Sequence, residues 1–303
     1  MKILVTGAAG FIGSHLIEEL KKADHRLILF DGCVSPSGFG SVVVGDFCEY
    51  EVVHGICIAM KPDIICHLGA IPSIKRSIDN PLVTLENNIK GTWNILEAAR
   101  RTRVERVVFA SSGAVYGETA FKFSGKALRE DMKSEPLNPY GLSKKFGEEM
   151  MSMWADKQIW KGVDTVSLRF SNVFGPRQPR GAAYASCIER FMYQWRSGEP
   201  FTVVPDGLQR RDMVFVTDVV RAIRFAAERP GSFGGLAINI GSGQNYSILE
   251  IADLIGGKDH SRVMIEPRVG EIRETLFDIS LAKAALNWQP EISFEEGIEI
   301  LKR

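Results

Sequence analysis

Tyr140 and Lys144 are the residues whose types and spacing point most directly to chemistry. They lie four residues apart in PYGLSKKFGEEM, where Asn138 can cap a helix and Pro139 can start it, so both side chains share one helix face. A phenol titrates near pH ~10 and is a poor base at neutral pH. Because a lysine ammonium one turn away favours the phenolate, the sequence predicts that Tyr140 accepts and returns a proton.

Ser112 is the third residue of this predicted site. It follows the apolar run VVFA, at the carboxyl edge of a predicted sheet, where α/β folds bind ligands. Its hydroxyl could bond the reacting oxygen atom. Taken alone, a Tyr-x-x-x-Lys spacing more often has a structural role than a catalytic one, and the same holds for a serine at a strand end. The three residues together predict proton transfer at one oxygen atom.

A glycine-rich turn follows the first predicted strand and opens into the helix SHLIEELKK. Gly7 permits the tight turn, Gly10 lets a pyrophosphate approach the backbone, and Gly13 allows close helix packing. Asp31 ends the second predicted strand, where its carboxylate can accept both ribose hydroxyls and repels a 2′-phosphate. These features predict NAD rather than NADP. Asp46, at the end of the third predicted strand, is either an adenine contact or a turn residue.

The elements that must position these residues are short apolar runs alternating with helical patterns. Runs that are apolar throughout suit parallel strands covered on both faces. We expect strands at 2–6, 26–31, 41–46, 63–68, 106–111 and 165–170, with helices at 11–23, 49–60, 82–102 and 139–160. This order predicts an α/β fold with a Rossmann-type doubly wound parallel sheet.

The pattern changes after residue 173 to shorter mixed elements separated by glycine- and proline-containing turns. We therefore expect an NAD-binding Rossmann domain over 1–173. Residues 174–303 should form mainly a smaller C-terminal α/β domain that binds the substrate. Within that part, 210–240 is expected to pack back on the Rossmann domain.

Composition excludes several classes of protein. The 303 residues include 37 Lys plus Arg and 37 Asp plus Glu, so no net charge recruits nucleic acid or an anionic membrane. There is no apolar stretch long enough to cross a bilayer and no long apolar core of a secretory signal, which predicts a cytoplasmic protein. The five cysteines form no C-x-x-C pair and the five histidines are dispersed, so we expect neither disulfides nor a metal site.

Taken together, the motifs resemble the extended short-chain dehydrogenase/reductase family, specifically its nucleotide-sugar 4-epimerases acting on UDP-glucose and UDP-galactose. The resemblance runs nearly end to end, through GAAGFIGSH, SIDNPLVTLENNIKGTWNILEAAR, ASSGAVYG, PLNPYGLSKKFGE, LRFSNVFGPRQ and DGLQRRDMVFVTDVVRA. It implies that Ser112, Tyr140 and Lys144 are the catalytic residues and that NAD stays tightly bound.

The resemblance also implies binding residues beyond the catalytic three. For the cofactor it adds Phe11, Ile12, Asp46, Phe47, Leu68, Ala70 and Asn88 to the three glycines, Asp31, Tyr140 and Lys144. For a UDP-sugar it implies Ser112, Asn172, Arg177, Gln178, Tyr184, Arg211, Arg268, Glu271 and Thr275. Two departures from the family pattern, Gly69 for an alanine and Pro72 for a lysine or glutamine, predict the loss of one NAD contact.

Gly113 and Ala114 follow Ser112 where sugar dehydratases of the family carry an Asp-Glu pair. Eliminating water needs that extra acid and base, so the resemblance favours epimerisation at C4 through a transient 4-keto sugar. Thr275 stands where a larger side chain would limit room at the sugar C2 position, which suggests the N-acetylhexosamine pair as further substrates.

Two alternatives stay open. One is a UDP-glucuronate 4-epimerase or decarboxylase, or another 4-keto branch of the family, with Arg180 as a contact for the uronate. The other is a non-catalytic Rossmann nucleotide sensor. The family resemblance further implies a homodimer formed through the helices near 82–102 and 139–160.

Overall fold

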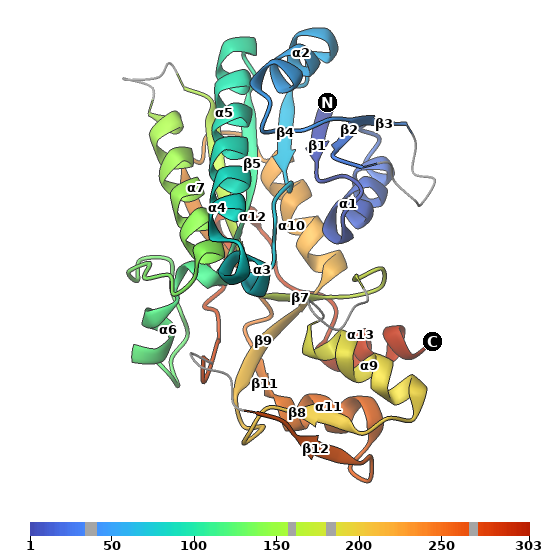
Figure 1. Ribbon diagram of the computed structural model, residues 1–303. Helices are drawn as coiled ribbons and strands as arrows, with labels where there is room; N and C mark the ends of the chain where they lie inside the picture. The colour runs from blue at the N-terminus through green and yellow to red at the C-terminus, as the bar shows by residue number, and fades with distance from the viewer. Residues whose placement is uncertain (34–40, 157–161, 180–185, 267–271) are drawn as a thin grey trace.

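The computed structural model describes residues 1–33, 41–156, 162–179, 186–266 and 272–303 (Figure 1). Its central feature is a parallel sheet of seven strands in the order β10-β6-β5-β4-β1-β2-β3. The strands are β1 Lys2–Thr6, β2 Arg26–Asp31, β3 Val42–Val44, β4 Ile64–His67, β5 Arg106–Ser112, β6 Asp164–Phe170 and β10 Leu236–Ile240. The strand order reverses between β1 and β4, so the predicted doubly wound Rossmann-type fold is confirmed.

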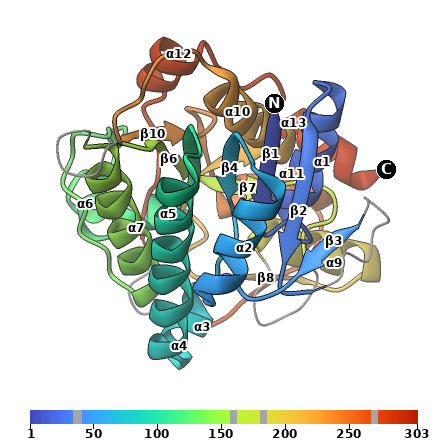
Figure 2. The ribbon, with the colours of Figure 1, turned by 90° about the horizontal axis from the view of Figure 1, so that it is seen from above.

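Helices cover both faces of this sheet. Figure 2 shows α2 (Tyr50–Met60), α5 (Gly91–Thr102) and α7 (Pro139–Ala155) on one face, with α1 (Phe11–Lys22) and α10 (Val216–Glu228) on the other. Each face has its own apolar core. Leu16 and Val219 belong to the first core, and Ile95 and Trp154 to the second. Burial on both faces explains why the strands are apolar throughout.

The helix expected over 82–102 is more broken than predicted. The chain forms α3 (Ile74–Asp79), then α4 (Pro81–Leu85), then a π-helical turn, η1 (Glu86–Lys90), and only then α5. Pro81 starts α4 because a proline at the first helical position loses no intrahelical hydrogen bond. The π turn inserts one extra residue into the helix and so rotates the side chains that precede α5.

Two other predicted boundaries move. β3 is shorter than the expected strand at 41–46, and its valines are partly or largely exposed. α7 ends at Ala155, and 157–161 lie outside the described residues. At its start, α7 is capped as expected, because Asn138 Oδ1 accepts a hydrogen bond of 2.8 Å from the Gly141 amide.

The rest of the chain builds two small sheets beside the central one. One has the order β11-β9-β7 and the other β12-β8. The strands are β7 Asn172–Phe174, β8 Phe201–Val203, β9 Arg210–Phe215, β11 Asn245–Ser247 and β12 Arg262–Met264. The helices are α9 Cys187–Ser197, α11 Ile248–Gly256, α12 Ser280–Leu286 and α13 Phe294–Lys302, with η2 Gly113–Val115 and α6 Glu118–Lys122 nearer the middle of the chain. Within 210–240, α10 and β10 pack with the central sheet, whereas β9 joins a small sheet.

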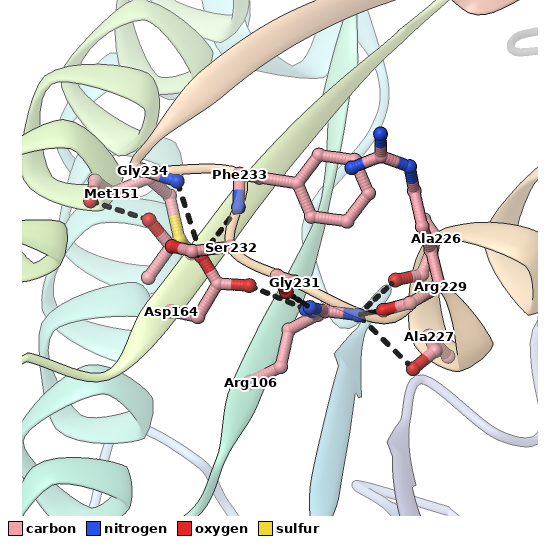
Figure 3. A network of polar contacts seen from close by, with 11 residues as sticks. Arg106, Met151, Asp164, Ala226, Ala227, Arg229, Gly231, Ser232, Phe233 and Gly234 are labelled. Atoms are coloured by element: carbon pink, nitrogen blue, oxygen red, sulfur yellow. Dashed lines mark hydrogen bonds and ion pairs between the residues drawn. The ribbon is translucent and has the colours of Figure 1, made fainter. Parts of the chain in front are cut away.

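A buried ion pair fixes α10 and β10 at the amino edge of the central sheet (Figure 3). Arg106 Nε donates to Asp164 Oδ2 at 2.6 Å, and Arg106 Nη1 donates to the carbonyls of Ala226 and Arg229 at the end of α10. Asp164 Oδ1 accepts from the Ser232 hydroxyl at 2.6 Å. The pair therefore ties the starts of β5 and β6 to the chain that leads from α10 into β10.

None of the helices in the described ranges has both the length and the apolar character needed to cross a membrane.

Candidate active site

A cavity of about 1190 Å³ opens at the carboxyl ends of the central strands. Its wall includes all three predicted catalytic residues together with the glycine-rich turn and Asp31. Other predicted cofactor residues in the wall are Phe11, Ile12, Asp46, Phe47, Leu68 and Ala70. The fold thus brings the predicted dinucleotide site and the predicted catalytic site into one space, at the switch point of the sheet.

The glycine-rich turn is packed too tightly for side chains. Gly7 has a φ of +69°, and a Cβ there would lie 2.8 Å from the Gly69 amide nitrogen. A Cβ on Gly13 would lie 2.1 Å from the Gly7 carbonyl oxygen. The first turn of α1 consequently approaches the cavity through bare backbone, which is what binding a pyrophosphate at a helix N-terminus requires.

Asp31 connects the end of β2 to this turn. Its Oδ2 accepts a hydrogen bond of 2.8 Å from the Ala9 amide, and its Oδ1 accepts one of 3.3 Å from the Cys33 amide. The carboxylate is held at the cavity wall, where a ribose would meet it.

Just after the neighbouring strand, β3, Asp46 is a turn residue as well as a lining residue. Its Oδ1 accepts from the Cys48 amide at 2.8 Å. Beside it, Asn87 lines the cavity, and its Oδ1 is buried without a partner among the described residues. An unpartnered buried acceptor is costly, so Asn87 fits a site that receives a donor such as an adenine amino group. Sequence reasoning missed Asn87.

Asn88, the residue predicted to contact the cofactor, has a different place. It is buried and absent from the cavity wall. Its Oδ1 accepts from the Ile71 amide at 2.8 Å, and its Nδ2 donates to the Ser143 hydroxyl at 3.0 Å. Asn88 therefore holds the loop after β4 against α7, while Asn87 faces the cavity. The π turn η1 sets which of the two adjacent asparagines does each task.

His67 is connected by hydrogen bonds to the same loop after β4. Thr6 Oγ1 lies 2.7 Å from His67 Nδ1, and His67 Nε2 lies 3.2 Å from Thr92 Oγ1. The Thr92 hydroxyl donates to the Asn88 carbonyl and the Gly69 amide donates to Thr6 Oγ1, so every group is satisfied when the proton is on Nε2. Burial lowers the pKa of His67 to about 3. The ring is therefore neutral and orients the loop.

Gly69, one of the departures from the family pattern, has a local explanation. A Cβ at this position would lie 2.9 Å from the Phe47 ring and 3.1 Å from Thr6 Oγ1. A Cβ on Gly91 would lie 2.2 Å from the same ring. Phe47 fills the space that an alanine at 69 would need.

The catalytic candidates meet at the far end of the cavity. Lys144 is 4% exposed, and its Nζ donates to the Ala110 carbonyl at 2.7 Å. Burial lowers the pKa of Lys144 to about 7, while the charge of Glu148 acts in the opposite direction. Burial raises the pKa of Tyr140, and a hydrogen bond with Ser112 lowers it. The hydroxyls of Ser112 and Tyr140 can thus both form hydrogen bonds with one substrate oxygen atom, and Lys144 lies next to Tyr140.

The predicted substrate residues are more scattered. Gln178 lines the cavity. Asn172 Nδ2 donates to the Asp212 carbonyl at 2.9 Å, and Thr275 Oγ1 accepts from the Asp212 amide at 3.4 Å. Arg211 lies on β9, outside the cavity wall. Tyr184, Arg268, Glu271 and the alternative uronate contact Arg180 lie outside the described residues.

Arg177 is bound to α1. Its guanidinium donates to both carboxylate oxygens of Glu18, each at 2.8 Å, and lies 2.7 Å from His15 Nδ1. The segment that follows β7 is therefore fastened to the helix of the glycine-rich turn.

Asp212 was not singled out from the sequence. Its carboxylate is fully buried and accepts from Ser171 Oγ, from the Ser242 amide at 2.8 Å and from the Phe277 amide at 3.1 Å. These bonds join three separate segments of the chain, one of which, at Ser171, lines the cavity.

Residues 3–241 match the NAD dependent epimerase/dehydratase family. This chain belongs to that family. It is an NAD-dependent enzyme of the extended short-chain dehydrogenase/reductase group, as the sequence predicted, and its class is that of the isomerases.

Several relatives are similar to this chain over nearly its whole length. A UDP-glucose 4-epimerase from Mycolicibacterium smegmatis is 36% identical over 98% of this chain and 96% of its own. The crystal structure of UDP-glucose 4-epimerase from Thermotoga maritima with UDP-glucose is 30% identical, with a TM-score of 0.92 over 100% of this chain and 97% of that one. The Thermus thermophilus UDP-glucose 4-epimerase complex with NAD is also 30% identical, with a TM-score of 0.88 over 100% and 98%.

Enzymes for other sugars match as well. A UDP-glucuronate 4-epimerase from Thermodesulfobacterium geofontis is 31% identical over 98% of this chain and 93% of its own. A structure of the UDP-N-acetylglucosamine 4-epimerase from Methanobrevibacter ruminantium is 27% identical, with a TM-score of 0.89 over 99% and 96%.

Proposed function

We propose that this enzyme interconverts the C4 epimers of a UDP-sugar, with UDP-glucose and UDP-galactose as the first candidates. The observation that carries this proposal is the position of Ser112, Tyr140 and Lys144 in the wall of the same cavity as the glycine-rich turn and Asp31. That arrangement supports oxidation and reduction at one sugar carbon beside a bound dinucleotide.

Epimerisation is favoured over dehydration by the surroundings of Gly113. A Cβ there would lie 2.6 Å from Cζ of Phe277, which is itself buried. An aspartate at this position would have to displace the ring. The site has no room for the additional acid that a sugar dehydratase carries after its hydroxyl residue.

When bound, NAD supplies a reversible hydride acceptor. Tyr140 takes the proton of the substrate O4 and later returns it, and Ser112 holds that oxygen by a hydrogen bond. Lys144 stabilises the phenolate form of Tyr140 by its positive charge. For the epimer to form, the cavity would have to admit the sugar with either face of C4 toward the bound dinucleotide, while Ser112 and Tyr140 hold its O4. The residues that would hold the cofactor are Gly7, Gly10, Phe11, Ile12, Gly13, Asp31, Asp46, Phe47, Leu68, Ala70 and Asn87. Asn88 would act indirectly, because it holds the loop after β4 in place.

Of the residues predicted for the UDP-sugar, Ser112 and Gln178 lie in the cavity wall. We propose that Asn172, Arg177, Tyr184, Arg211, Arg268, Glu271 and Thr275 complete the substrate site, with Arg211 and Arg268 balancing the diphosphate charge and Arg177 at the start of a substrate loop. A second candidate is the N-acetylhexosamine pair, because the resemblance puts the small Thr275 where the side chain that limits room at the sugar C2 position stands, and because a related UDP-N-acetylglucosamine 4-epimerase has a similar fold. UDP-glucuronate is the remaining alternative, supported by the relative that acts on it.

We further propose that the enzyme is cytoplasmic. Its buried cysteines Cys57 and Cys66 take part in no disulfide, which fits a reducing compartment.

The test of the proposed function is turnover without added cofactor. Purified enzyme is incubated separately with UDP-galactose, UDP-N-acetylgalactosamine, UDP-glucuronate and dTDP-glucose, and the products are separated by anion-exchange chromatography. We expect conversion of UDP-galactose to UDP-glucose by retained NAD, and a loss of at least ~100-fold in Tyr140→Phe. Turnover of UDP-glucuronate or dTDP-glucose alone would overturn the assignment of substrate.

A further inference from the structure

Glu148 lies one helical turn beyond Lys144, on the face of α7 that also carries Tyr140. Its side chain is 10% exposed and does not belong to the cavity wall. The Ser111 hydroxyl donates to Glu148 Oε1 at 2.5 Å. Because Ser111 immediately precedes Ser112 on β5, this bond joins the helix of Tyr140 and Lys144 to the strand of Ser112.

Arg169 holds the same carboxylate from β6. Its Nε donates to Glu148 Oε1 at 2.9 Å and its Nη2 to Oε2 at 2.7 Å, in a two-pronged pair whose arginine is 6% exposed. On its other side, Nη1 donates to the Tyr116 hydroxyl at 3.0 Å, and that hydroxyl donates to Asn239 Oδ1 at 2.7 Å. The Glu148 carboxylate is therefore held from two strands, β5 and β6, and its partner Arg169 is held in turn by Tyr116.

A buried ion pair is a poor way to gain stability, because the cost of removing both charges from water offsets most of their attraction. Apolar residues of similar size would hold α7 against the sheet equally well. The charge at 148 must therefore be explained by what lies next to it.

That neighbour is the Lys144 ammonium. Around it lie the Phe109 ring, 4.7 Å from Nζ, the Tyr140 ring, 5.9 Å away, and the neutral His67. Burial disfavours the charged lysine, and Glu148 is the carboxylate whose charge opposes this. Arg169, on β6, orients the Glu148 carboxylate through its two-pronged pair.

We propose that Glu148 is a positioning residue of this active site: clamped by Ser111 and Arg169, it keeps the Lys144 ammonium charged and the Tyr140–Lys144 turn of α7 seated against β5. The consequence for Tyr140 rests on the proposed function, whereas the effect on Lys144 does not.

The first test needs no turnover. The pH titration of Lys144 is followed by NMR in holoenzyme with 13Cε-labelled lysine, its signal being assigned with Lys144→Arg. Glu148→Gln should lower the midpoint by about one pH unit, since it removes the opposing charge. Glu149→Gln, which removes an exposed carboxylate one residue away, should leave the midpoint unchanged. An unchanged midpoint in Glu148→Gln would overturn the proposal, even if the enzyme proves to use another sugar.

The second test distinguishes an effect of Glu148 on Lys144 from a purely structural role of the Glu148–Arg169 pair. With the sugar that the wild type converts, Glu148→Gln should lose about fivefold in kcat at neutral pH and regain most of it at lower pH, because Lys144 is then reprotonated. Glu148→Asp should restore most of the wild-type profile. Since Glu148→Gln leaves Arg169 buried without its partner, the neutral double variant Glu148→Gln/Arg169→Gln guards against a folding defect. A double variant with wild-type Lys144 titration and wild-type pH profile would show that the pair is only structural.

Discussion

The Thr6–His67–Thr92 chain is a feature at the scale of single residues that makes stability depend on pH. The pKa of His67 is about 3 in the folded protein, below its ordinary value of 6.5, so the unfolded chain binds more protons between these values. The stability that the neutral ring contributes is complete above pH 6.5 and is lost as the pH falls toward 3. From pH 7 to 5 the loss should be about 2 kcal/mol.

This is measured by urea unfolding at both pH values. His67→Asn should be less stable at pH 7 and should show a loss between pH 7 and 5 that is smaller by about 2 kcal/mol. An equal acid dependence in the variant and the wild type would mean that His67 is not the group responsible.

Gly113 gives a second prediction for a single residue. Gly113→Ala should destabilise the protein by about 1–3 kcal/mol, because the added Cβ meets the Phe277 ring. Phe277→Leu in the same chain should recover part of that loss by opening space. Thermal unfolding of the two variants checks this, and a fully stable Gly113→Ala protein would remove the steric argument against a dehydratase.

At the scale of elements, the Arg106–Asp164 pair makes α10 and β10 dependent on β5 and β6 (Figure 3). Arg106→Met leaves Asp164 and the carbonyls at the end of α10 without their partner, which should cost about 3–5 kcal/mol in the free energy of unfolding. Arg101→Met is the matched control, since Arg101 forms an exposed pair with Glu97 and should cost less than about 1 kcal/mol. Similar losses in both variants would contradict the role given to Arg106.

The elements also show what could be predicted from the sequence. Six of the seven central strands, the glycine-rich turn, Asp31 and the Tyr140–Lys144 pair follow from local spacing, and the structure places them close to where the patterns indicate, with β3 shorter than expected. The division between Asn87 and Asn88 depends on a π turn that no periodicity announces. The contacts of Gly113 with Phe277 and of Arg177 with Glu18 join distant parts of the chain, so no local pattern could predict them.

At the scale of the whole molecule, the two helical segments expected at a dimer contact expose large apolar side chains. These are Leu82 on α4, Trp93 on α5, and Leu142, Phe146 and Met153 on α7. α4 and α7 are also packed against each other, so these side chains are available for one shared surface. We propose that two copies of the chain cover it in a homodimer.

Light scattering of the purified protein should give twice the mass of the chain. Phe146→Glu should shift the mass toward the monomer, because a carboxylate would be buried at the contact. Ile58→Glu, which adds the same charge at an exposed apolar position on α2 and outside both segments, should remain dimeric. A monomeric wild type would refute this contact.

The central claim is that one cavity joins a retained dinucleotide to an acid–base site for C4 of a UDP-sugar. The most direct measurement is incubation of the enzyme with UDP-galactose and no added NAD, followed by chromatography of the nucleotide sugars. We predict conversion to UDP-glucose, abolished by Tyr140→Phe without loss of bound NAD. Conversion that persists in Tyr140→Phe, or no conversion of any UDP-sugar even when NAD is supplied, would contradict the account.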